Sequence, residues 1–181
     1  MHSSSKKIAK YKLTLTKEIN RKKEKIDENL KILKGIPLFN WIEISPIDAC
    51  NRKCVFCPKS DPVNYPDTFK KMDNDLVKKL AEELKSFNYK GTVIFAGYGE
   101  PLLDKNIYEK INHLSTICNT EVTTNGDPLN KRVIKRLIDS GIGKIIVSLY
   151  DGPEQILKFE KLFKECDVKG NKYILRDRWY K

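Results

Sequence analysis

Residues 41–58 read WIEISPIDACNRKCVFCP, a short strand pattern that runs into a loop with three cysteines. Cys50, Cys54 and Cys57 follow one another at a Cys-x3-Cys-x2-Cys spacing. Three thiolates held this close can bind a soft metal centre, but a closed tetrahedral site needs four ligands. The motif therefore predicts a metal centre with an open coordination position, at which chemistry can take place.

Apolar patterns typical of strands and helices alternate along the chain from residue 38 onward. Helical stripes separate the strand patterns, and the first stripe begins after a candidate N-cap at Asp73 or Asn74. Repeated strand–helix units of this kind build a parallel sheet with helices packed outside it. The predicted fold is therefore α/β, with strands at 41–44, 91–96, 121–124, 144–149 and 173–175.

Polar or glycine-rich residues follow each of the first four predicted strands. The cysteines follow the first strand, Gly97-Tyr98-Gly99-Glu100-Pro101 follows the second, and Asn125-Gly126 follows the third. Ser148 lies at the end of the fourth strand, and Tyr150-Asp151-Gly152 comes just after it. Because parallel sheets bind ligands at the carboxyl ends of their strands, these segments are expected to meet at one rim.

Two plainer interpretations of the three cysteines stay open. A structural zinc site would need a fourth ligand, and neither a second Cys-x2-Cys pair nor a His-x3-His pair is present. The cysteines could also be ordinary reduced thiols, buried as small apolar side chains. The polar residues 51–53 argue against a buried stripe. The remaining candidates for a fourth zinc ligand are Cys118, Cys166, His2 and His113.

The cysteine motif resembles the cluster-binding motif of the radical S-adenosylmethionine (radical SAM) enzymes. In that family, three cysteines hold three irons of a 4Fe–4S cluster, and SAM chelates the fourth iron through its amino and carboxylate groups. The resemblance implies that Cys50, Cys54 and Cys57 are the metal ligands. It also implies that Phe56, the aromatic residue before the third cysteine, lies near the adenine of SAM.

The segment Tyr98-Gly99-Glu100-Pro101 resembles a second motif of the family, of Gly-Gly-Glu-Pro type, with Tyr98 in place of the first glycine. The family uses this motif to bind the methionyl amino group of SAM. Gly99 lets the backbone approach a ligand closely, and Pro101 fixes the turn. Glu100 can accept hydrogen bonds from an ammonium group. The motif is therefore expected to bind SAM.

The resemblance also implies that Asn125 and Ser148 contact the ribose and the methionyl carboxylate of SAM. From the residues alone, Asn125-Gly126 equally fits a plain turn, and Ser148 equally fits a small inward-facing strand residue. Arg176 or Arg178 could meet a carboxylate at the rim after the fifth strand.

The implied reaction is that of a radical SAM oxidoreductase. A reduced cluster cleaves SAM to methionine and a 5′-deoxyadenosyl radical, which removes a hydrogen atom from a peptide, sugar or small metabolite. The electron would come from a donor such as flavodoxin or ferredoxin. No residue of the sequence marks a substrate acid or base.

A radical SAM core is usually a six-stranded partial (β/α) barrel, and five strand patterns are visible here. The resemblance therefore predicts an incomplete (β/α)6 TIM-like partial barrel over residues 38–181. The Tyr-Gly-Glu-Pro and Ser-Leu-Tyr-Asp-Gly sequences look most like members with a C-terminal SPASM-type domain. We expect a truncated chain, which a C-terminal domain or a partner chain would complete.

Residues 1–37 are expected to form a basic, helical N-terminal extension. Residues 1–35 hold ten Lys and one Arg against four acidic residues, which is +7 of the formal net charge of +11. Gly35 and Pro37 are expected to end the helix. Tyr11 is the one aromatic residue among the basic ones, which is not the regular interleaving of a single-strand binder, so nucleic-acid binding is not expected. Four apolar residues recur at helical spacing, namely Ile19, Ile26, Leu30 and Leu33.

The expected location is the cytoplasm, without a membrane. No apolar run approaches the roughly 20 residues of a membrane span, and the first seven residues lack the apolar core of a signal peptide. A reducing compartment also keeps thiolates available for metal binding. Two functions besides an enzyme are carried forward. One is a non-catalytic iron–sulfur module or a subunit that needs a partner, and the other is a zinc-stabilised, basic nucleic-acid-binding protein.

Overall fold

The computed structural model describes residues 20, 23, 31–33 and 35–179. Within this part of the chain, five parallel strands form one sheet in the order β3-β4-β5-β6-β7. Each strand pairs with the next one along the chain, which is the order of a (β/α) barrel. The α/β fold and its partial-barrel architecture are therefore confirmed. The strands are β3 (Trp41–Ile44), β4 (Thr92–Phe95), β5 (Asn119–Thr124), β6 (Lys144–Leu149) and β7 (Tyr173–Asp177).

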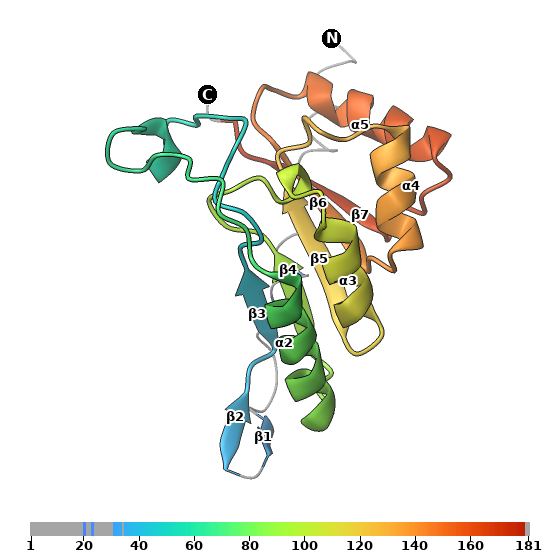
Figure 1. Cartoon of the computed structure of the whole chain (residues 1–181). Coiled ribbons are helices and arrows are strands. Elements are labelled where there is room, and N and C mark those ends of the chain that lie inside the picture. The colour runs from blue at the N-terminus through green and yellow to red at the C-terminus, as the bar shows by residue number, and fades with distance from the viewer. Residues whose placement is uncertain (1–19, 21–22, 24–30, 34, 180–181) are drawn as a thin grey trace.

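The helices between the strands all pack on one face of the sheet, as Figure 1 shows. All five strands and all four intervening helices lie where the sequence predicts them, and the strands agree to within two residues. Of the two candidate caps, Asp73 is the N-cap of α2, because its side chain accepts a hydrogen bond from the backbone of Asp75. The helices are α2 (Asn74–Ser86), α3 (Ile107–Ser115), α4 (Lys131–Asp139) and α5 (Glu154–Glu165).

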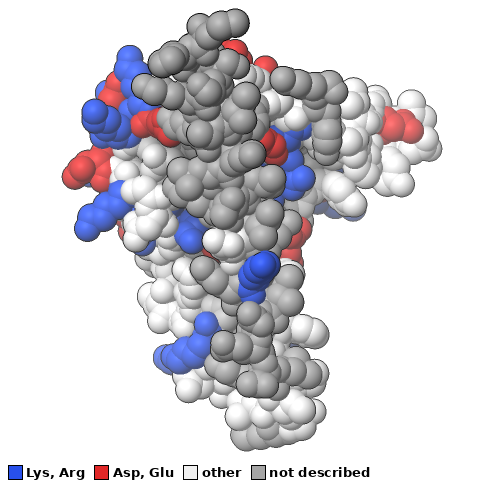
Figure 2. Space-filling view, turned by 180° about the vertical axis from the view of Figure 1, so that it is seen from behind, with Lys and Arg blue, Asp and Glu red and all other residues white. Residues whose placement is uncertain are grey.

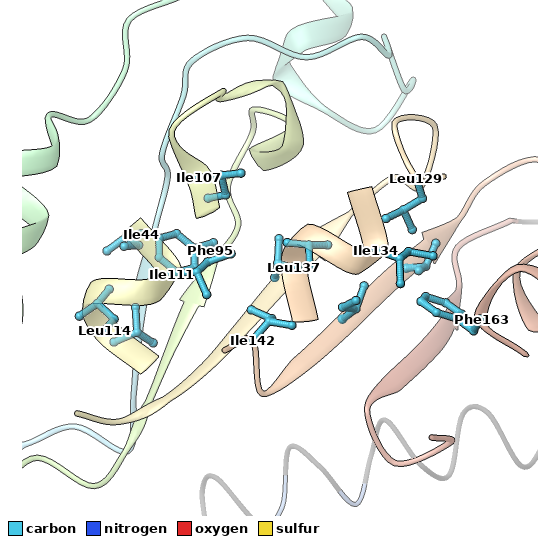
Figure 3. Close-up of a cluster of buried hydrophobic side chains, with 14 of the residues drawn as sticks. Ile44, Phe95, Ile107, Ile111, Leu114, Leu129, Ile134, Leu137, Ile142 and Phe163 are labelled. Atoms are coloured by element: carbon cyan, nitrogen blue, oxygen red, sulfur yellow. The ribbon is translucent and has the colours of Figure 1, made fainter. Parts of the chain in front are cut away.

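The core lies between the sheet and these helices (Figure 3). Strand residues alternate between the two faces of a sheet, so every second strand residue points at the helices. Each fully buried aliphatic or aromatic side chain contributes roughly 1.5–3 kcal/mol. This layer fixes the strands firmly and leaves their carboxyl ends to form a rim. The residues without solvent exposure include Val93, Phe95, Ile107, Ile111, Leu114, Val122, Ile134, Leu137, Ile145, Val147 and Phe163.

The expected end of the N-terminal helix is wrong. Residues Lys31–Leu33 form strand β1, which pairs antiparallel with β2 (Ile36–Leu38). Gly35 lies between the two strands at φ +78°, a conformation that glycine adopts readily, so it forms a hairpin turn and not a helix end. Pro37 lies within β2.

The rest of the predicted extension is described in part. Asn20 and Lys23 are helical, whereas Ile19, Ile26 and Leu30 lie outside the described residues. The boundary between residues 37 and 38 stays a prediction. Figure 1 shows the hairpin at the amino edge of the sheet, on the far side from the cysteine loop (residues 50–57).

Two further observations concern the distribution of charge on the surface and the apolar character of the helices. Figure 2 shows Lys and Arg interspersed with Asp and Glu over the described part of the face opposite to that of Figure 1. Among the described residues, no helix combines the length and the apolar character that crossing a membrane requires.

Candidate functional site

Three cysteine side chains line a cavity of about 200 Å³ at the carboxyl edge of the sheet. Cys50, Cys54 and Cys57 provide one wall. The structure thus brings the segments after β3, β4, β5 and β6 together around one space. Of the residues that the resemblance assigns to the cluster or to SAM, only Pro101 is not on the walls, because it begins the short 3-10 helix η2 (Pro101–Leu103) behind Glu100. The other walls are Arg52, Phe56, Gly97, Tyr98, Gly99, Glu100, Thr123, Thr124, Asn125, Ser148 and Tyr150.

The three thiols are free and half-buried. Burial raises the pKa of the Cys50 and Cys54 thiols, while the positive charge of Arg52 opposes this rise at Cys54. A thiol must lose its proton to bind metal, so metal loading of this site would release protons. Three thiols on one cavity suit a 4Fe–4S cluster that keeps one iron for another ligand.

The candidates for a fourth zinc ligand lie elsewhere. His113 lines a different cavity, between α2 and α3. Cys118 donates a weak hydrogen bond to Leu114 at the end of α3, and Cys166 is the C-cap of α5. His2 lies outside the described residues. Over residues 35–179, no three His, Cys, Asp or Glu side chains converge into a site for a single metal ion.

Arg52 ties the cysteine loop to the loops that follow β5 and β6. Its Nε and Nη2 donate to the two carboxylate oxygens of Asp127, each at 2.6 Å. Its Nη1 and Nη2 donate to Asp151 at 2.6 and 2.7 Å. The guanidinium holds the pKa of Asp151 below its usual range. Sequence reasoning assigned no role to Arg52 or Asp127; a basic residue between two cysteines and acidic residues just after two strands were the available signal.

The outer side of the same loop is held by a second set of charges. Lys53 pairs with Asp67 at 2.5 Å, and Asp67 also accepts a hydrogen bond from the backbone of Cys50 at 3.2 Å. The buried ammonium of Lys59 pairs with Asp48 and lies 3.4 Å from Asp67. Lys53 foremost lowers the pKa of Asp67, and Lys59 lowers that of Asp48. The cysteine loop is thus fixed on both flanks.

Glu100 is buried and joins two of the rim segments. Its carboxylate accepts hydrogen bonds from the hydroxyl of Thr124 at 2.7 Å and from the backbone of Asn125 at 2.8 Å. It also accepts from the backbone of Leu102 at 3.1 Å, which caps η2. Burial nevertheless raises the pKa of Glu100. The observed partners are the protein's own donors, so the predicted contact of Glu100 with an ammonium group stays a prediction.

Gly99 lies directly against the cysteine segment. A Cβ at this position would come within 1.9 Å of the carbonyl oxygen of Ile47. The backbone of the next residue, Glu100, donates to the carbonyl of Ala49 at 2.8 Å. The close approach that Gly99 permits is therefore to the protein's own backbone; an approach to a ligand is untested.

Asn125 and Ser148 point their polar groups to the rim. The Nδ2 of Asn125 donates to Asn51 at 2.8 Å and lies 3.9 Å from the sulfur of Cys50. The Oδ1 of Asn125 accepts from the backbone of Asp127 at 2.9 Å. Ser148 is buried, and its hydroxyl accepts from Arg176 at 2.9 Å. Arg176 thus holds the hydroxyl of Ser148 in place. The predicted contacts of Arg176, Ser148 and Asn125 with a ligand stay predictions.

Two aromatic rings also line the cavity. The rings of Phe56 and Tyr150 lie 5.6 Å apart between centroids. Beyond them, a second cavity of about 430 Å³ shares Arg52, Cys54, Phe56 and Tyr150 with the first, and also reaches Arg178 and Trp179. The two cavities thus adjoin each other at the cysteine loop.

The sequence matches the model of the Radical SAM superfamily over residues 44–169. It is 35% identical over 135 residues to the S-adenosyl-L-methionine-dependent 2-deoxy-scyllo-inosamine dehydrogenase of Niallia circulans, covering 71% of this chain and 51% of that protein. It is 29% identical over 113 residues to the GTP 3',8-cyclase of Clostridium perfringens (strain 13 / Type A), covering 61% of this chain and 34% of that one.

A solved structure shows the same fold. The crystal structure of BtrN in complex with AdoMet and 2-DOIA has a TM-score of 0.65 and 31% sequence identity, covering 78% of this chain and 57% of that one. The chain therefore spans about half the length of the dehydrogenase and of BtrN.

Proposed function

This chain belongs to the radical SAM superfamily, and on that premise we propose that it carries out the reductive cleavage of SAM and passes the radical to a substrate. The family's cofactors are a 4Fe–4S cluster and SAM, and the residues at the rim fit both. One observation carries the proposal, namely that three free thiols, the segment Tyr98-Gly99-Glu100 and Asn125 gather around one cavity. The family motifs thus meet in space as well as in sequence.

Cys50, Cys54 and Cys57 would hold the cluster, and the polar groups opposite them would orient SAM. When bound, the two cofactors supply a one-electron cleavage of the C5′–S bond and hence a carbon radical that can remove a hydrogen atom. The residues of the chain would bind the two cofactors, orient them and shield them. Asn125 and Ser148 present hydrogen-bonding groups, and the rings of Phe56 and Tyr150 limit access of water.

The substrate we propose is a small hydroxylated metabolite. The names of the two relatives give 2-deoxy-scyllo-inosamine for the dehydrogenase and GTP for the cyclase, and both are small molecules that carry hydroxyl groups. Of the peptide, sugar or small metabolite considered from the sequence, this class agrees best with those names. The electron donor would be a protein such as flavodoxin or ferredoxin, and the compartment a reducing one such as the cytoplasm. A SPASM-type domain or partner chain that completes the barrel stays a prediction.

The test is anaerobic reconstitution with iron and sulfide, followed by electron paramagnetic resonance (EPR) of the reduced protein with and without SAM. We expect a 4Fe–4S signal that changes shape when SAM is added, and 5′-deoxyadenosine and methionine after addition of a strong reductant. A protein that retains zinc and assembles no cluster would refute the proposal. A cluster whose EPR signal does not change when SAM is added would favour the non-catalytic iron–sulfur module.

A further inference from the structure

We propose that Arg52 is a positioning residue, which holds the cysteine loop (residues 50–57) against the loops after β5 and β6 before any cofactor binds. The inference rests on the proposed function, because that loop carries the cysteines assigned to the cluster. The eight residues of the cysteine loop, the last part of segment 45–57 between β3 and the 3-10 helix η1 (Pro58–Ser60), have few backbone hydrogen bonds of their own. Its position must then be set by side chains.

The geometry of the contact requires an arginine. Arg52 uses Nε, Nη1 and Nη2 together, so that one planar guanidinium forms a bidentate pair with Asp127 and another with Asp151. Lysine carries a single ammonium group and cannot present two forks at once. A change from Arg52 to Lys keeps the charge and removes the geometry. This variant therefore tests whether the geometry of the guanidinium, and not only its positive charge, holds the loop.

Burial shows which of the two pairs is stronger. The side chain of Arg52 is 18% exposed, that of Asp127 is 35% exposed and that of Asp151 is 56% exposed. Solvent screens exposed ion pairs, so the pair with Asp151 is worth less than the pair with Asp127. Asp127 also accepts a hydrogen bond from Asn51 at 2.9 Å. Asp127 is therefore the main anchor of the loop.

The same contacts reach a predicted SAM-binding residue. Asn51 accepts a hydrogen bond from Asn125, and the backbone of Asp127 donates to the other side of the Asn125 amide. If Arg52 releases Asp127, the loop after β5 keeps only the uncharged contacts of Asn51 to the cysteine loop, and Asn125 is held less firmly in its orientation. Arg52 thus acts on the cluster ligands and on the SAM-binding wall together.

Lys53 provides a matched control on the same loop. It is the next residue, it is also cationic, and it pairs with Asp67 on the outer flank of the loop. None of its recorded contacts reaches the loops after β5 or β6. Lys53→Gln therefore removes a charge from the cysteine loop and leaves the Arg52 contacts in place.

The first experiment measures hydrogen exchange by mass spectrometry on the metal-free chain, in peptides that cover residues 50–60, 125–128 and 150–153. In Arg52→Lys, exchange should become about tenfold faster in all three peptides, which corresponds to about 1.4 kcal/mol. Asp127→Asn should give the same pattern with a smaller change, and Asp151→Asn the smallest change. Lys53→Gln should leave residues 125–128 and 150–153 as in the wild type.

The second experiment uses the reconstituted protein and separates positioning from general stability. Arg52→Lys should still assemble a cluster, lose its iron faster than the wild type and show a weaker SAM-dependent change in the EPR signal. Lys53→Gln should keep that change. Arg52→Lys with wild-type exchange in the three peptides and a wild-type response to SAM would overturn the proposal.

Two further outcomes, a variant that does not fold and a wild-type chain without a cluster, also have a definite interpretation. If Arg52→Lys does not fold, Asp127→Asn and Asp151→Asn carry the same test, and wild-type exchange in both overturns the proposal. If the wild-type chain assembles no cluster, the proposed function fails. The exchange pattern of the metal-free chain still decides whether Arg52 positions the loop.

Discussion

At its amino edge the sheet is flanked by a cavity of about 620 Å³, whereas the cavity at its carboxyl edge measures about 200 Å³. The amino-edge cavity lies between α2 and α3 and is lined by Lys78, Lys85, Lys90, His113 and Glu82 together with neutral residues. The carboxyl-edge cavity gathers three thiols, a buried carboxylate and two glycines. The larger of the two cavities is therefore not the one that contains the candidate site.

The two edges also differ in how their loops are held. At the carboxyl edge, Arg52 joins three loops, and Glu100 joins the segments after β4 and β5. At the amino edge, the recorded contacts of the cavity-lining lysines are local, such as Lys78 with Asp75 three residues before it. Hydrogen bonds between uncharged groups, such as that of Ser115 with Ser140, also join segments at the amino edge. The edge with the candidate chemistry differs in that a shared guanidinium and a buried carboxylate join its loops, as a preorganised site requires.

The largest difference between the edges is expected in metal binding. Cys54→Ala should reduce the affinity for the cluster more than about 100-fold, because even residues that only orient metal ligands cost 10–100-fold when they are removed. Lys85→Gln, at the amino-edge cavity, should leave iron binding unchanged. Iron and sulfide analysis after anaerobic reconstitution checks both variants. Equal iron content in Cys54→Ala and wild type would remove the carboxyl-edge cavity as the metal site.

The next effect is on stability. Gly99→Ala should destabilise the protein by about 3 kcal/mol or more, since a Cβ would meet a backbone carbonyl and overpacking is costly. Gly170→Ala is the matched control, because a Cβ there meets no atom within 4 Å. Its effect should stay within about 0.5 kcal/mol. Urea unfolding of the metal-free proteins measures both values, and similar losses in the two variants would contradict the packing argument.

A smaller effect concerns pH. Burial raises the pKa of Glu100 above its ordinary value of 4.5, so the unfolded chain loses this proton at a lower pH than the folded chain. The folded state then binds more protons, and the free energy of unfolding falls as pH rises above 4.5, until the pH passes the folded pKa. One such group gives a slope of at most about 1.4 kcal/mol per pH unit.

Glu100→Gln should remove this part of the slope. Urea unfolding at a series of pH values measures it, and the same substitution at the exposed residue Glu82, on the amino-edge cavity, serves as the comparison. An unchanged slope in Glu100→Gln would show that the buried carboxyl is not the titrating group.

The smallest expected effect separates folding from metal binding. Asp73→Ala removes the N-cap of α2 and should cost about 1 kcal/mol of stability. Because the cap contacts only the first turn of that helix, cluster content should remain that of the wild type. Thermal unfolding and iron analysis together test this. Loss of iron in Asp73→Ala would show that the carboxyl edge responds to any destabilisation, and would weaken the contrast between the edges.

The sheet was predictable because its signals are local. The five strands are short, largely apolar runs, and the helices between them carry apolar stripes at helical spacing, so pattern alone located each element. The cysteine motif and the Tyr98–Pro101 turn were equally readable. The hairpin of β1 and β2 was missed because Leu33 continued a helical stripe, whereas Gly35 and backbone pairing between Lys31–Leu33 and Ile36–Leu38 decided the local structure.

By itself, the sequence determined the α/β class, the positions of the strands along the chain and the three thiols that suit a cluster, because spacing and period are properties of neighbouring residues. Only the tertiary structure decided which distant charges meet. The pairs that Arg52 forms with Asp127 and Asp151 join residues 75 and 99 positions apart. Such contacts depend on how the strands bring their carboxyl ends together, so no local pattern in the sequence encodes them.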